Sequence, residues 1–263
     1  MPAVMMVMIM AVIMFVVEQF VPLSNSAERA ICCGAFYKPF VLAGEWWRLL
    51  TVMFLHGSIL HLLMNLFSLY NMGMALEPRL GTRKFATILL GSTIGGSLFV
   101  LISNGSVVSV GMSGGLYGIM ACMIYVMARG GLLRDPFLRR DLLSTLFVNL
   151  LINFMPGIAW QAHLGGFITG LFLTASLLKD NDKSITRNWR LAAAVYMAGI
   201  VALAGVNWNM DGQNVYAASD LNVLQVYDKA GMHGHSMKIA ESLDHIYGIS
   251  YLEAALQMED LNG

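Results

Sequence analysis

The chain has 263 residues, of which 57% are hydrophobic and only 12% are charged. A soluble domain usually carries about 25% charged residues, so this composition excludes an ordinary soluble globular protein and favours a polytopic membrane protein. The 16 basic and 16 acidic side chains cancel, which excludes a global basic field for nucleic acid, and three cysteines make no disulfide framework.

Seven apolar runs are long enough to cross a bilayer, for which a helix needs about 20 residues. They cover residues 3–23, 59–76, 85–103, 113–128, 142–158, 162–178 and 191–208. We therefore expect an all-α fold with a seven-span membrane domain over residues 1–208. The first run lacks a basic leader and is too long for the apolar part of a signal peptide, so we expect it to be retained.

The distribution of Lys and Arg predicts the orientation of these spans. The loops after the second, fourth and sixth spans hold 11 of the 16 basic residues. Basic residues concentrate in cytoplasmic loops, so we expect a cytoplasmic N-terminus and an extracytoplasmic C-terminus. No Arg-rich, Ser-rich leader precedes the first span, which argues against a mitochondrial protein and favours a bacterial inner membrane.

Two segments lie outside the spans. Residues 24–58 are rich in aromatic side chains, which favour the membrane interface. Residues 209–263 are acidic, and apolar residues recur there at helical spacing. We expect a loop at the interface and a partly helical extracytoplasmic tail.

Polar side chains inside apolar helices are informative because burying them in a bilayer is costly. Four of them stand near the starts of the second, fourth and sixth spans: His61, Asn65, Ser113 and His163. These three spans run in the same direction, from outside to inside. We therefore expect the four side chains at one depth, in a polar cavity that opens to the outer face.

A serine and a histidine at one depth suit nucleophilic catalysis. The hydroxyl of Ser113 becomes nucleophilic when a base such as the imidazole of His163 removes its proton. Asn65, His61 and the backbone N–H of Ser113 are candidate donors to the oxyanion that forms. No Asp or Glu is available at this depth in the three spans, so the sequence predicts a Ser–His dyad. Tyr117, one turn after Ser113, is placed to stack on His163.

Small residues give a reason for the two helices to approach closely. Gly114 and Gly118 are four apart in the fourth span, as are Ala162, Gly166 and Gly170 in the sixth. Such faces let membrane helices pack backbone to backbone. If the two faces meet, Ser113 and His163 come within hydrogen-bond distance.

Each feature has an ordinary structural explanation when it is taken alone. A serine in a membrane helix usually bonds back to its own backbone, a histidine is often a packed structural residue, and GxSG is a short pattern. The concurrence of these side chains on three co-oriented helices favours the catalytic interpretation.

With these residues in place, the chain resembles the rhomboid family of intramembrane serine proteases over roughly residues 40–178. The motifs that carry the resemblance are Trp47-Arg48, His56 with His61 and Asn65, GMALEPRLG with Glu77, Arg79 and Gly81, Gly111-Met112-Ser113-Gly114 with Tyr117, and Ala162-His163 with Gly165, Gly166 and Gly170. The seventh span at 191–208 is similar to that of the six-plus-one subgroup, in which an extra helix follows a six-helix bundle.

The resemblance implies a serine endopeptidase that cuts transmembrane segments of other proteins near the outer face. It implies Ser113 as nucleophile, His163 as general base, and His61 and Asn65 as oxyanion partners. Its first histidine, His56, would be structural. Trp47 and Arg48 would belong to the membrane-embedded first loop and support the fold. Gly111, Gly114 and Tyr117 would be supporting residues in the motif of the nucleophile, and no cofactor or metal is implied.

Three other functions compete with this one. A proteolytically inactive scaffold that binds client membrane helices would use the same fold. A transporter would need intramembrane charges along a path, which the third and fifth spans lack. A metal site at His233 and His235 is disfavoured, because two residues apart is poor spacing on a helix. We therefore expect membrane-protein substrates and the lipid bilayer as partners, with no nucleic acid and no metal.

Overall fold

The computed structural model describes residues 2–103, 108–155, 157–178, 183–206, 217–248 and 250–251. These residues are mostly helical. Their strands are β1 (Phe36–Tyr37) and β2 (Val108–Ser109), which pair antiparallel with Phe36 opposite Ser109. The predicted all-α fold class is confirmed.

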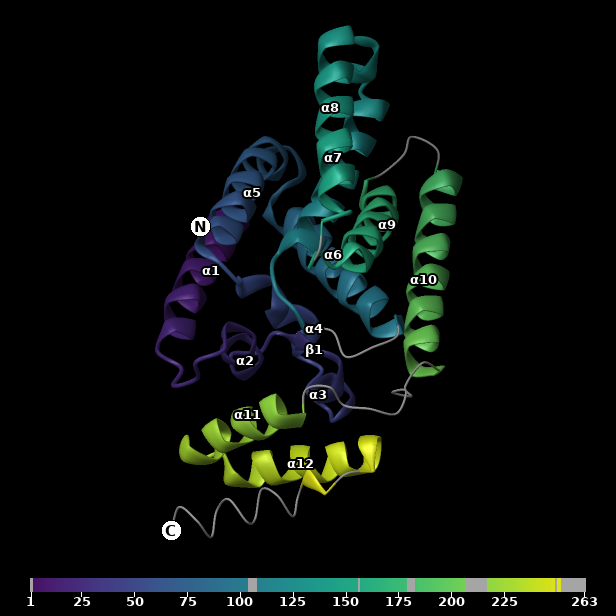
Figure 1. The fold of residues 1–263 in the computed structure, drawn as a ribbon. Helices are drawn as coiled ribbons and strands as arrows, with labels where there is room; N and C mark the ends of the chain where they lie inside the picture. The colour runs from purple at the N-terminus through teal and green to yellow at the C-terminus, as the bar shows by residue number, and fades with distance from the viewer. Residues whose placement is uncertain are drawn as a thin grey trace.

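A long helix falls on each of the seven apolar runs (Figure 1). These helices are α1 (Ala3–Gln19), α5 (Ile59–Leu80), α6 (Thr82–Ile102), α7 (Ser113–Arg129), α8 (Pro136–Ile152), α9 (Trp160–Leu177) and α10 (Lys183–Val206). Among the described residues, α5, α6 and α10 are each long and apolar enough to cross a membrane. Figure 1 shows α6, α7 and α9 together in the centre, with α1 and α5 on one side and α10 on the other.

The fifth run was predicted at 142–158, but α8 begins at Pro136 and ends at Ile152. The early start has a local cause. The Oδ1 atom of Asp135 accepts hydrogen bonds from the backbone N–H groups of Phe137 (2.8 Å) and Leu138 (3.2 Å), and proline suits the first helical position. Because α8 ends at Ile152, Asn153 lies just beyond the helix.

Helix α10 also differs from the predicted run at 191–208, because it begins at Lys183. Its first two turns are polar. The apolar run therefore marked only part of the helix, since backbone hydrogen bonding continues through polar residues. The end of that run, residues 207–208, lies outside the described residues.

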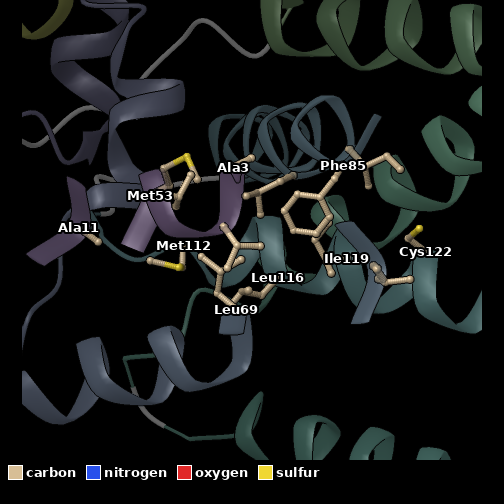
Figure 2. Packing of buried hydrophobic residues seen from close by; sticks show 14 of the residues in the cluster. Ala3, Ala11, Met53, Leu69, Phe85, Met112, Leu116, Ile119 and Cys122 are labelled. Carbon is tan, nitrogen blue, oxygen red and sulfur yellow. The ribbon is translucent and has the colours of Figure 1, made fainter. Parts of the chain in front are cut away.

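One apolar core joins α1, α5, α6 and α7. Leu69 of α5, Phe85 of α6, and Leu116 and Ile119 of α7 are buried in it, and Figure 2 shows these side chains clustered. The opposite face of α5 is apolar and exposed, with Phe67 72% exposed. An exposed apolar face of this kind suits contact with lipid.

The segment before α5 folds into short helices, α2 (Ser26–Cys32), α3 (Lys38–Leu42), α4 (Arg48–Thr51) and the 3-10 turn η1 (Val52–Phe54). A second 3-10 turn, η2 (Leu132–Arg134), joins α7 to α8. The described part of the tail forms a helical hairpin of α11 (Ala217–Lys229) and α12 (His233–Tyr247). This hairpin packs against α2 and α3, at the lower end of the molecule in Figure 1.

Candidate active site

Ser113 and His163 form a hydrogen-bonded pair. Ser113 is the first residue of α7 and His163 lies in the first turn of α9, fifty positions later in the chain. The Nε2 atom of His163 lies 2.8 Å from the Oγ atom of Ser113. The imidazole is 6% exposed, whereas Ser113 is only half-buried. The pair is therefore sheltered on the histidine side and accessible on the serine side.

The pair meets because the two small-residue faces pack backbone to backbone, as the sequence predicted. A Cβ atom on Gly166 would lie 2.7 Å from the carbonyl carbon of Gly114, and one on Gly170 would lie 2.7 Å from the carbonyl carbon of Gly118. Real Cβ atoms do not approach backbone atoms so closely. Only glycine on α9 permits this contact, which brings Ser113 beside His163.

The first turn of α7 presents free backbone donors next to Ser113. The first intrahelical bond of α7 runs from the N–H of Leu116 to the carbonyl of Met112 (3.0 Å). The preceding N–H groups, including that of Ser113, have no intrahelical partner and stand at the positive end of the helix dipole. This arrangement favours negative charge beside the serine.

Tyr117 holds the face of the histidine ring. The rings of Tyr117 and His163 stack with centroids 4.2 Å apart and an interplanar angle of 9°. The hydroxyl of Tyr117 donates to the backbone carbonyl of Asn149 (3.0 Å), which ties the stacked pair to α8.

Asn153 is a site residue that the sequence analysis missed. Its Oδ1 atom lies 2.5 Å from Nδ1 of His163, and its Nδ2 donates to the Tyr117 hydroxyl (2.9 Å) and to the carbonyl of Asn149 (3.0 Å). The sequence analysis predicted a Ser–His dyad because it found no Asp or Glu at this depth, and the structure places an amide, not a carboxylate, at Nδ1 of His163. The signal in the sequence is an asparagine directly after the fifth helix, a polar side chain that can accept a hydrogen bond as a carboxylate does.

Of the two predicted oxyanion residues, His61 lies against the turn that precedes Ser113. The ring of His61 packs closely against Gly111. A Cβ atom added to Gly111 would lie only 2.8 Å from Cε1 of His61. The Nδ2 of Asn65 donates to the backbone carbonyl of His61 (2.9 Å). Within the described residues neither side chain has a hydrogen bond to Ser113, so their role in binding an oxyanion stays a prediction.

His56 packs edge-on against His61, with ring centroids 5.1 Å apart and an interplanar angle of 66°. Its ring is buried, and its two nitrogens have no hydrogen-bond partner in the described part of the chain. In this structure His56 therefore supports the ring of His61 by packing.

Trp47 and Arg48 lie in the first loop, where Arg48 is fully buried. Its guanidinium pairs with Glu45 and donates to the carbonyls of Ile31 (2.7 Å) and Ala35 (2.8 Å) and to the Tyr227 hydroxyl (2.8 Å). Trp47 is 49% exposed. These contacts hold the loop and the tail together.

The two histidines weighed as metal ligands each have a carboxylate partner. Nδ1 of His233 lies 2.6 Å from Oδ1 of Asp228, and Nε2 of His235 lies 2.7 Å from Oε1 of Glu45. The second contact joins α12 to the first loop.

A narrow cavity lies next to Ser113. Small side chains and glycines form much of its wall. Its lining residues are Phe36, Val52, Thr93, Ser97, Val100, Ser109, Gly111, Ser113, Gly114 and Ala162.

Comparison with known proteins identifies the family. The Rhomboid domain matches residues 43–180, which include the Ser113–His163 pair. The chain is 36% identical over 149 residues to RHOMBOID-like protein 5 of Arabidopsis thaliana, covering 55% of this chain and 48% of that protein. It is 33% identical over 158 residues to Rhomboid protease GluP of Bacillus subtilis (strain 168), covering 59% of this chain and 30% of that protein.

A further relative carries the name Inactive RHOMBOID-like protein 8, from Arabidopsis thaliana. It is 33% identical over 147 residues, covering 55% of this chain and 42% of that protein. The chain thus spans about half or less of the length of these curated relatives. The matched domain is more than half of this chain and is a helical membrane bundle. The chain belongs to the rhomboid family.

Proposed function

We propose that the chain is an intramembrane serine endopeptidase that cleaves transmembrane segments of other membrane proteins near the outer face. The observation that carries this proposal is the 2.8 Å contact between the Ser113 hydroxyl and Nε2 of His163. A hydroxyl within hydrogen-bond distance of a neutral imidazole is an activated nucleophile. The Bacillus subtilis relative, which is named a protease, supports the same class of reaction.

In the proposed mechanism, His163 takes the Ser113 proton as Oγ attacks the carbonyl carbon of the scissile bond. The resulting oxyanion receives hydrogen bonds from the backbone N–H of Ser113, with Asn65 and His61 as further donors. His163 then gives the proton to the leaving amine, which departs. The same imidazole then takes a proton from water as the water oxygen attacks the acyl carbon. The bond from that carbon to Oγ of Ser113 breaks, and His163 returns the proton to Oγ.

The substrate has to expose a carbonyl that a helix normally hides in its own hydrogen bonds. Segments that unwind easily, with Gly, Pro or Ser near the cut, are therefore the expected substrates. The cavity beside Ser113 is narrow and lined largely by small side chains, so small residues next to the cut fit it.

The proposed location is a cell membrane, with the N-terminus cytoplasmic and the site near the outer face. Helices α5, α7 and α9 carry the site residues near their N-terminal ends. The concentration of basic residues after these three helices supports this orientation. A bacterial inner membrane is the proposed compartment.

Two separate assays test the proposal: covalent reaction with a fluorophosphonate, and cleavage of a model membrane substrate by unlabelled protein. We expect the label on Ser113, and Ser113→Ala to lose both labelling and about 10³-fold or more of the cleavage rate. Ser176→Ala is the matched control, because the hydroxyl of Ser176 in α9 bonds back to the carbonyl of Leu173 (2.8 Å) and, among the described residues, to no other group. If Ser113→Ala cleaved the substrate near the wild-type rate, Ser113 would not be the nucleophile.

The alternative is a scaffold that binds client membrane helices without proteolytic activity. The relative named inactive supports this alternative. The same assay separates the two. A scaffold would bind the model transmembrane segment while the wild-type protein neither cleaves it nor reacts with the probe.

A further inference from the structure

We infer that Asn153 is a positioning residue for His163, so that Ser113, His163 and Asn153 form one hydrogen-bonded row. The inference rests on the proposed serine protease function and extends it. Asn153 lies 2.5 Å from Nδ1 of the imidazole, whose Nε2 lies 2.8 Å from the nucleophile. Asn153 does not touch the reacting atoms, and acts through the ring between them.

The neighbouring groups determine which way the Asn153 amide points. The backbone carbonyl of Asn149 can only accept, so the amide atom 3.0 Å from it has to be the donor Nδ2. The remaining atom, Oδ1, then faces His163. An asparagine oxygen is an acceptor only, so Nδ1 of His163 has to carry a proton.

This assignment fixes the tautomer of His163. With the proton on Nδ1, the neutral ring keeps its lone pair on Nε2, which faces the hydroxyl of Ser113. That is the form that can accept the serine proton. The other tautomer would place a proton between Nε2 and Oγ and leave two acceptors facing each other at Asn153.

The same amide anchors the stacked tyrosine. Nδ2 of Asn153 donates to the Tyr117 hydroxyl at 2.9 Å, and that hydroxyl donates to the carbonyl of Asn149 at 3.0 Å. Tyr117 therefore restrains the face of the imidazole while Asn153 restrains its edge. Both restraints come together at the end of α8.

The neutral amide differs from the carboxylate of a Ser–His–Asp triad. It orients the ring and selects the tautomer, but it supplies no negative charge to the imidazolium that forms during the reaction. We therefore expect Asn153 to contribute less than the general base itself, whose contribution is about 10²–10⁴-fold.

The test follows the reaction of purified full-length protein with a fluorophosphonate over time, at several pH values. In this reaction the Oγ–P bond forms, fluoride leaves and the serine proton passes to His163. The rate constant reports activation of Ser113, whereas the final labelled fraction reports the amount of folded, competent protein. The two readouts separate positioning from a structural role.

We expect Asn153→Ala to lower the rate constant about 10- to 100-fold, a part of what a general base contributes, while the final labelled fraction stays near the wild-type value. Asn153→Asp retains an acceptor at Nδ1 and should regain much of the rate. Its carboxylate favours the imidazolium, so the ascending limb of its pH–rate profile should move to higher pH.

Asn71→Ala is the matched control. Asn71 lies in α5, and its exposed side chain bonds back to the backbone carbonyl of Phe67 (2.8 Å). Neither its side chain nor its backbone belongs to the network around His163, so this variant should react at the wild-type rate.

Three outcomes would overturn the inference: an unchanged rate constant in Asn153→Ala, a lower labelled fraction at an unchanged rate, or equal slowing in Asn71→Ala. Failure of the proposed function looks different. In that case the wild-type protein itself is not labelled at Ser113 and cleaves no membrane substrate.

Discussion

Gly111 is held in place by two independent constraints next to Ser113. Its φ of +112° lies in the left-handed region, where a side chain is strained. A Cβ atom there would also lie 2.8 Å from Cε1 and 2.9 Å from Nε2 of His61. Any larger residue has to displace either the turn that presents Ser113 or the ring of His61.

We expect Gly111→Ala to destabilise the protein by about 1–3 kcal/mol, the usual range for a strained backbone position. The measurement is the midpoint of thermal unfolding in detergent. Gly199→Ala is the control, because Gly199 lies in α10 with open space around its Cβ position, and alanine favours a helix. Equal midpoints for the two variants would contradict this account.

The sequence alone predicted those site residues whose positions follow from the helical period and the direction of the spans. Ser113 and His163 are such residues, since co-oriented helices put their first turns at one depth. Asn153 is not, because its position depends on where α8 ends and how the following loop turns. The end of an apolar run does not determine either of these.

The tail hairpin and the first loop form one packed element on the α2–α3 side of the bundle. The Tyr227 ring lies 6.5 Å from the ring of Phe40, and its hydroxyl accepts a hydrogen bond from Arg48 (2.8 Å). Burial is the main reason that the pKa of Tyr227 is raised. The hydroxyl therefore stays protonated at neutral pH beside the buried guanidinium.

We expect Tyr227→Phe to cost about 1–3 kcal/mol of stability, because one donor of the buried Arg48 guanidinium loses its acceptor. Thermal unfolding in detergent measures the loss. Tyr125→Phe removes a comparable Arg–Tyr contact at an exposed site, with Arg129 at 3.3 Å, and should leave the midpoint unchanged. If the two variants unfold at the same temperature, Tyr227 does not anchor the tail.

Element boundaries and partners were harder to predict than the elements themselves. Helical spacing of Leu221, Leu224 and Tyr227 correctly indicated a helix in the tail. It did not indicate what that helix packs against, because an apolar stripe fits any apolar partner. The contact with Arg48 becomes visible only in three dimensions.

The contact between the tail and the first loop also bears on the whole molecule. The loop precedes α5 and the tail follows α10, and the two meet at one end of the bundle (Figure 1). They therefore lie on the same side of any membrane that the bundle crosses. Together with the basic residues after α5, α7 and α9, this favours an extracytoplasmic tail.

Reporter fusions measure this orientation directly. An alkaline phosphatase, active only outside the cytoplasm, should be active when fused after Asn262 and silent when placed near Arg134 in the turn between α7 and α8. The basis is the excess of Lys and Arg in the loops assigned to the cytoplasm. The opposite pattern would invert the orientation and move the site to the inner face.

The close contact of α7 and α9 affects how inactive relatives should be identified from sequence. Gly166 and Gly170 touch the backbone of α7, so even an alanine there would push the serine-bearing and histidine-bearing helices apart. A relative can therefore keep both the serine and the histidine and still lose the proposed reaction through one added methyl group. A search of genomes for active members should check the glycines at these two positions as strictly as the serine and the histidine.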